Sequence, residues 1–170
     1  MKYRHGFVSN SSTSSFICEI CGNTESGMDC SAEELGFIEC DNGHEICQEE
    51  AIEGYQEAMD ARNEAECKAD YGEEGYFEEE NLPSEYCPIC NFEVPSMPDI
   101  ERYFHKQYGI PDSEVFDYVK KINPRRKKLY PHEYNEYVMR QKELRIEDVL
   151  AMLKTQYNGS YHSFKKDLKS

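Results

Sequence analysis

The sequence predicts an α+β protein in which a small metal-stabilised module is followed by a small helical domain. Three observations lead to this prediction. Cys and His residues gather in clusters within the first 90 residues. Only 38% of the residues are hydrophobic, which argues against one large apolar core and for a part that a metal stabilises. After Ser96, apolar residues recur at helical spacing between short loops, as in a small bundle.

The clusters have the spacing of zinc ligands. Zinc prefers four tetrahedral ligands from thiolate and imidazole, and two Cys separated by two residues can face one ion from a tight turn. Seven residues are placed in this way: Cys18-x-x-Cys21, Cys40-x-x-x-His44-x-x-Cys47 and Cys87-x-x-Cys90. Two complete sites need eight ligands. The sequence therefore predicts zinc as the cofactor, with either two ions or one.

Composition along the chain divides it into three parts. Residues 1–16 are rich in Ser, residues 17–95 form an acidic zinc-binding domain, and residues 96–170 form the helical domain. Alanines and apolar residues at helical spacing place an inserted helix at 48–70. Start and stop signals place four more helices: Pro98–Tyr108, Ser113–Ile122, Pro131–Lys142 and Ile146–Gln156.

The net charge of −15 is unevenly distributed. Residues 1–99 hold 24 Asp and Glu against 4 Lys and Arg, a net charge of −20, whereas residues 100–170 hold 10 against 15, a net charge of +5. Nucleic-acid affinity depends on Lys and Arg, so the acidic half is not expected to bind phosphate backbones. It either binds a basic protein or keeps the chain soluble. The cations that offer a nucleic-acid contact form one patch: Lys120, Lys121, Arg125, Arg126, Lys127 and Lys128.

The order of the clusters resembles that of the RING-finger family and related treble-clef modules. Ile20 just before Cys21 and Pro88 just after Cys87 strengthen the resemblance, as does the run from Gly43 to Cys47. It implies a small zinc-bound, treble-clef or RING-like module over Cys18–Cys90, in which the ligands alternate between two ions.

This resemblance assigns the ligands to two sites. One ion would be held by Cys40, His44, Cys87 and Cys90. The other would be held by Cys18, Cys21, Cys47 and the residue at position 50, which is Glu50 where the family has Cys or His. A carboxylate can ligate zinc, so Glu50 can fill this place; Cys30, water or no metal at all are the alternatives. In a rival topology, a single ion is shared by Cys18, Cys21, Cys87 and Cys90.

The chain opens with a second resemblance. Residues 4–16, RHGFVSNSSTSSF, are similar to a leader, R-x-G-F-V-S-N-S-S-S-S-S-F, that begins many small phage and bacterial proteins, with Thr13 in place of a Ser. This similarity suggests a tailed phage or bacterial origin. The segment is either a structural strand and turn before Cys18 or a recognition signal.

These features predict a zinc-stabilised protein-interaction module, a phage-type accessory or host-modulating protein with a basic partner. A RING-type ubiquitin-ligase-like transfer adaptor and a nucleic-acid-binding regulator are the alternatives. An enzyme is not expected, since no catalytic set is evident. The chain has no apolar run of membrane-spanning length and no signal-peptide core, so we expect a cytoplasmic protein, in the host if phage-encoded. No role is assigned to the isolated residues: His5, Cys67, His105, His132 and His162.

Overall fold

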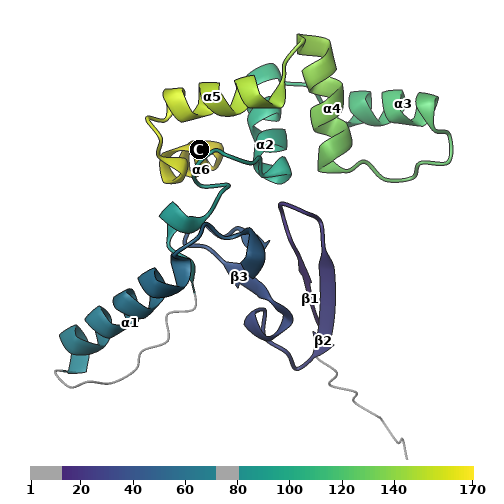
Figure 1. The fold of residues 1–170 in the computed structure, drawn as a ribbon. Helices are drawn as coiled ribbons and strands as arrows, with labels where there is room; N and C mark the ends of the chain where they lie inside the picture. The colour runs from purple at the N-terminus through teal and green to yellow at the C-terminus, as the bar shows by residue number, and fades with distance from the viewer. Residues whose placement is uncertain (1–12, 72–80) are drawn as a thin grey trace, which may run out of the picture.

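The computed structural model describes residues 13–71 and 81–170, and of residues 13 and 66–71 only the backbone. Two small antiparallel sheets and six α-helices make up these residues, so the predicted mixed α+β class is confirmed (Figure 1). Most of the Ser-rich leader, with His5, lies outside the described residues, as does the Cys67 side chain.

Both sheets are hairpins. Strand β1 (Thr13–Ile17) pairs with β2 (Thr24–Met28), and the Cys18–Cys21 segment is the turn between them. Strand β3 (Phe37–Glu39) pairs with β4 (Glu45–Cys47). In this second hairpin Gly43 adopts φ +78°, a conformation that favours glycine, and the tight turn places both ends of the hairpin loop side by side.

Helix α1 (Tyr55–Tyr71) is shorter at its start than the predicted helix at 48–70. Residues Gln48–Glu50 form a single 3₁₀ turn instead. The two segments cannot join because Gly54 between them has φ +89°, outside the right-handed helical region. The predicted helix was too long because the helical spacing of residues continues across Gly54, whereas the backbone conformation of Gly54 interrupts the helix.

The other helices follow in chain order: α2 (Met97–Tyr108), α3 (Asp112–Ile122), α4 (Pro131–Lys142), α5 (Ile146–Gln156) and α6 (Tyr161–Leu168). The first four agree with the prediction to within one residue at each end. Helix α6 was missed because it has only eight residues. Its apolar residues Tyr161, Phe164 and Leu168 recur at helical spacing, and the Ser160 side chain accepts a hydrogen bond from the backbone N–H of Ser163 as its N-cap.

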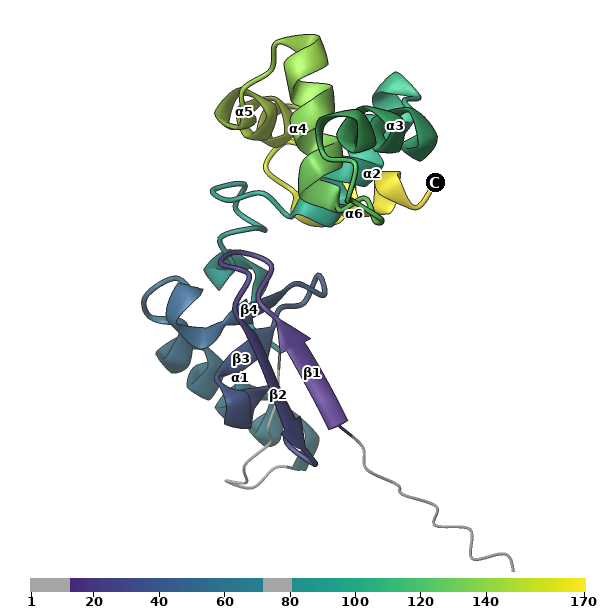
Figure 2. The same cartoon turned by 90° about the vertical axis from the view of Figure 1, so that its right-hand side faces the viewer.

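The strands and α1 lie on one side of the molecule and α2–α6 on the other, as both views show (Figures 1 and 2). The buried side chains nevertheless form one continuous core. Phe92, next to the last Cys pair, packs against Tyr161 and Phe164 of α6 with ring centroids 4.9 and 6.1 Å apart. The proposed division of the chain at residue 95 stays a prediction. None of the described helices combines the length and hydrophobicity that crossing a membrane requires.

Candidate metal centres

The deeper of two sulfur-rich clusters consists of Cys40, His44, Cys87 and Cys90. All four side chains are buried, and their donor atoms lie within 4.8 Å of one another. The β3–β4 turn carries the first two residues. The second pair is brought to them by Leu82, whose backbone bridges Cys40 in a parallel arrangement. Two segments more than 40 residues apart thus meet at one point.

The distances in this cluster fit a tetrahedral ion. Zn–S bonds of about 2.3 Å and Zn–N bonds of about 2.05 Å at tetrahedral angles give S···S of about 3.8 Å and S···N of about 3.6 Å. The Sγ atoms of Cys40 and Cys90 are 3.7 Å apart. His44 Nδ1 lies 3.3, 3.8 and 3.4 Å from the sulfurs of Cys40, Cys87 and Cys90. The S···S separation is far longer than a disulfide bond, and the seven described cysteines are free thiols. The donor set and its spacing are therefore compatible with a metal ion.

The orientation of His44 is set from the helical half of the molecule. Its Nδ1 faces the sulfurs, and its Nε2 lies 3.4 Å from Asp99 Oδ2 of α2. With Nδ1 bound to a metal ion, Nε2 would carry the proton and donate it to this carboxylate. Asp99 is 1% exposed and also accepts from the Tyr161 hydroxyl at 3.2 Å and Lys165 Nζ at 2.9 Å. The Tyr161 ring meets the imidazole edge-on, 4.8 Å between centroids. A carboxylate that holds the outer nitrogen of a ligating His is a usual feature of metal sites.

These contacts perturb the ionisation of the groups involved. Burial alone would raise the pKa of Asp99, but hydrogen bonds with His44 and Lys165 lower it to about 2. Burial would lower the pKa of His44, but hydrogen bonds with Asp99 and Cys40 raise it to about 11. Hydrogen bonds from Cys87 and Cys90 lower the pKa of the Cys40 thiol. The cluster thus favours a thiolate at Cys40, the form that binds metal ions, and a bound cation must displace the proton at His44 Nδ1.

The second cluster consists of Cys18, Cys21 and Cys47, whose sulfurs also lie within 4.8 Å of one another. The Sγ atoms of Cys21 and Cys47 are 3.7 Å apart, again the tetrahedral spacing. Backbone N–H groups of Cys21 and Cys47 donate to Cys18 Sγ at 3.5 and 3.3 Å. Cys18 and Cys47 are buried, whereas Cys21 is exposed. This cluster therefore reaches the protein surface.

Neither protein residue considered for the fourth place in this second cluster joins it. Glu50 lies in the 3₁₀ turn after Cys47, and its carboxylate is not among the donor atoms that converge within 4.8 Å. Cys30 cannot approach. Cys18 precedes the turn end of the β1–β2 hairpin, where Ile17 faces Thr24, whereas Cys30 follows the opposite end, where Met28 faces Thr13. Four residue steps of about 3.3 Å separate the two ends.

The ligands of the two clusters alternate along the chain, because the Cys40-x-x-x-His44-x-x-Cys47 motif is divided between them. Cys47 joins the first Cys pair, and Cys40 and His44 join the last. The rival topology, with one ion shared by the first and last Cys pairs, is not the arrangement found.

Several residues around the buried cluster escaped sequence reasoning. Asp99, Tyr161 and Lys165 come from helices 50 or more residues after His44, and nothing local in the sequence relates them to a metal centre. A further group, Glu101, His105 and Asp112, was also missed.

This further group joins two helices of the bundle. His105 Nε2 lies 2.5 Å from Asp112 Oδ1, and its ring stacks on Tyr134 at 4.5 Å. The i, i+4 spacing of Glu101 and His105 on α2 was the available signal. His105 is thus not isolated: it ties the end of α2 to the start of α3.

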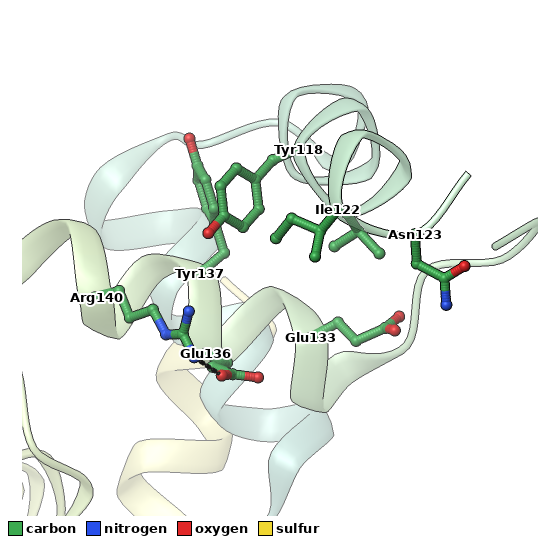
Figure 3. A pocket seen from close by; sticks show the side chains of 8 residues that line it. Tyr118, Ile122, Asn123, Glu133, Glu136, Tyr137 and Arg140 are labelled. Carbon is green, nitrogen blue, oxygen red and sulfur yellow. Dashed lines mark hydrogen bonds and ion pairs between the residues drawn. The ribbon is translucent and has the colours of Figure 1, made fainter. Parts of the chain in front are cut away.

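The predicted basic patch lies at the end of α3 and in the loop before α4. Its members are exposed except Arg126, which is half-buried, contacts Glu133 with Nε–Oε1 of 2.7 Å and lies over the Tyr130 ring. Beside it, a pocket of about 240 Å³ opens between α3 and α4. In Figure 3, Tyr118 and Tyr137 lie together at one side of this pocket, with Ile122 facing it.

Two Cys-rich clusters, with the residues that orient them, and one basic patch are therefore the main candidate sites among the described residues. Comparison of the chain with protein-family models, with curated proteins and with solved structures finds no match.

Proposed function

We propose that the protein is a zinc-stabilised interaction protein whose N-terminal half binds a basic protein partner. Zinc is the ion best suited to three thiolates and one imidazole at tetrahedral spacing, the donor set of Cys40, His44, Cys87 and Cys90. All four donors are protein side chains and all are buried, which is typical of zinc that supports a fold and not of zinc that acts on a substrate.

The observation that carries the choice of partner is the charge of the module's surface. In residues 14–65 and 81–95, thirteen Asp and Glu side chains are exposed, whereas Arg62 is the one Lys or Arg. Arg62 itself lies 3.4 Å from the Asp41 carboxylate. A surface of one sign attracts a partner of the opposite sign and speeds its association. The acidic surface therefore supports a basic protein as the partner.

The test combines a metal count with a binding measurement. Native mass spectrometry with and without a chelator should count two zinc ions per chain. Affinity purification with the tagged full chain should recover a protein of high isoelectric point that is released as salt increases. A variant in which the exposed Glu57, Asp60 and Glu64 of α1 are changed to Gln, Asn and Gln should retain less of it, with the zinc count unchanged. The absence of stoichiometric zinc, or a partner whose retention ignores salt and these substitutions, would refute the proposal.

The ubiquitin-ligase-like alternative loses support. Pro88, part of the RING resemblance, is buried, and Ile20 is partly buried against the core. The two flanking positions that strengthened the RING resemblance therefore serve largely in internal packing. Failure of the protein to stimulate ubiquitin discharge from conjugating enzymes would remove this alternative.

One observation favours a second candidate function, single-stranded nucleic-acid binding by the helical half. Lys120, Lys121, Arg125, Lys127 and Lys128 are exposed beside the α3–α4 pocket, which two tyrosines line. Cations that track a backbone next to aromatic rings are typical of such sites. Reversing the charges in this patch should abolish a salt-sensitive oligonucleotide complex, and binding that survives the reversal would exclude the patch.

A further inference from the structure

The two sulfur clusters differ in how far this chain completes them. The buried cluster has four donors, three sulfurs and the nitrogen of His44. The cluster of Cys18, Cys21 and Cys47 has three, and in the described part of the chain no further Cys, His, Asp or Glu brings a donor atom within 4.8 Å of all of them. Tetrahedral zinc needs a fourth ligand, and a ligand that does not come from the protein's own fold comes from solution or from a bound molecule.

The position of the three-sulfur cluster makes it accessible to such a molecule. Cys21 is exposed and its sulfur belongs to the cluster. The cluster lies at the turn end of the β1–β2 hairpin, where Cys18 directly follows β1. The sulfur positions are already set, because two backbone N–H groups donate to Cys18 Sγ and the Asn23 amide lies 4.0 Å from Cys47 Sγ. An incoming ligand thus meets a formed triangle of sulfurs at the surface.

Charge selects the chemical class of this ligand. Three thiolates and a divalent ion carry a net charge of −1, and the carboxylates of Glu19 and Glu45 lie next to the Cys18 turn: Glu45 Oε1 accepts the Ile17 N–H and Glu19 Oε2 accepts from Ser96. The exposed surface around the module is acidic as well. A carboxylate, phosphate or further thiolate would add negative charge to this environment, whereas an imidazole is neutral.

The buried cluster supports the same choice. There, the same set of three thiolates is completed by an imidazole nitrogen, that of His44. We infer that the cluster of Cys18, Cys21 and Cys47 takes its fourth ligand from a histidine of the protein partner, so that the partner's imidazole completes the surface zinc site. This inference rests on the proposed zinc-dependent interaction function and specifies where the partner makes contact. Binding then combines long-range attraction to the acidic surface with one directional coordination bond.

The test replaces zinc by Co²⁺ in the full chain, because the visible absorption of tetrahedral cobalt reports its ligands. Two Co²⁺ ions should bind per chain. Titration with imidazole should then produce a saturable shift of the visible bands with a stoichiometry of one imidazole, while acetate should produce none. The Cys47→Ser variant should bind one Co²⁺ and show no response to imidazole, which locates the effect at the surface cluster.

Each of the following outcomes would overturn the inference. Two bound ions without a saturable response to imidazole would refute it and leave the proposed zinc module intact, as would binding of only one ion, whereas the absence of any bound ion would refute both. A saturable response to 2-mercaptoethanol with none to imidazole would show that the ligand class is wrong. Altered cobalt bands in the His5→Ala or Cys67→Ala protein before any ligand is added would show that the chain supplies the fourth ligand itself.

Discussion

Replacement of Asp99 by Asn should weaken metal binding at a site that Asp99 does not itself ligate. The carboxylate is 1% exposed and lies 3.4 Å from the outer nitrogen of His44. Asn has nearly the same shape but no charge, so it no longer favours the tautomer that presents Nδ1 to the sulfurs. Loss of such an outer partner typically lowers metal affinity 10–100-fold, or about 1.4–2.7 kcal/mol.

The same substitution should also lower the free energy of unfolding. Asp99 pairs with Lys165 Nζ at 2.9 Å and Arg102 at 3.2 Å. Removal of one member of a buried ion pair costs about 3–5 kcal/mol, but the Lys165 and Arg102 side chains are 18% and 62% exposed and can regain water. We therefore expect a loss of roughly 2 kcal/mol, below the fully buried value.

The assay is competition for zinc with a chromophoric chelator, carried out in the Cys47→Ser background so that only the buried cluster is titrated. Asp117→Asn, an exposed substitution on α3, is the matched control and should not change zinc affinity. Zinc affinity of Asp99→Asn within twofold of its parent would refute the reasoning. In that case, the contact between Asp99 and His44 would contribute to packing alone.

Three further predictions follow from the same structure. Chelation of the metal should expose residues 13–95 to protease before α2–α5, since both sulfur clusters lie in residues 18–90, while the helices also have aromatic contacts with one another, such as Tyr118 with Tyr137. Native mass spectrometry should show one metal ion fewer in Cys47→Ser and an unchanged count in Cys30→Ser, because only the former belongs to a cluster. Burial raises the pKa of Tyr134 from its usual value of 10.0 to about 12, so the protonated form is favoured by folding. The stability gained from this is complete below pH 10 and is lost as the pH rises through about 12; alkaline unfolding should show this loss, and Tyr134→Phe should reduce it.

The sequence predicted the helical half well because its helices are long, amphipathic and clearly bounded. Helix α4 begins at Pro131, and α2 ends before Gly109, which adopts φ +63° as its C-cap. Helix α1 was predicted too long because Ala and Glu favour helix on both sides of Gly54, and the break depends on one backbone torsion. Local patterns thus identify an element more reliably than its ends.

For the candidate site, spacing in the sequence identified the donors but not their surroundings. A pair such as Cys87-x-x-Cys90 is local chemistry, visible without a fold. Whether Glu50 could be a ligand depended on the direction in which the 3₁₀ turn points its side chain. Its carboxylate does not join the sulfurs of Cys18, Cys21 and Cys47. Asp99 and Tyr161 reach His44 only because α2 and α6 fold back on the module, a long-range arrangement that no local pattern encodes.

The alternation of ligands between the two clusters imposes an order on the assembly of the nascent chain. The surface cluster has all three of its sulfurs once Cys47 has been synthesised, whereas the buried cluster waits for Cys90, more than 40 residues later. The contacts that orient His44 are complete only when Tyr161, which packs against its ring, and Lys165, which pairs with Asp99, have also been synthesised. Helix α6 therefore completes the surroundings of a histidine that is synthesised more than 100 residues earlier, and a truncation that removes α6 would disturb the buried metal centre.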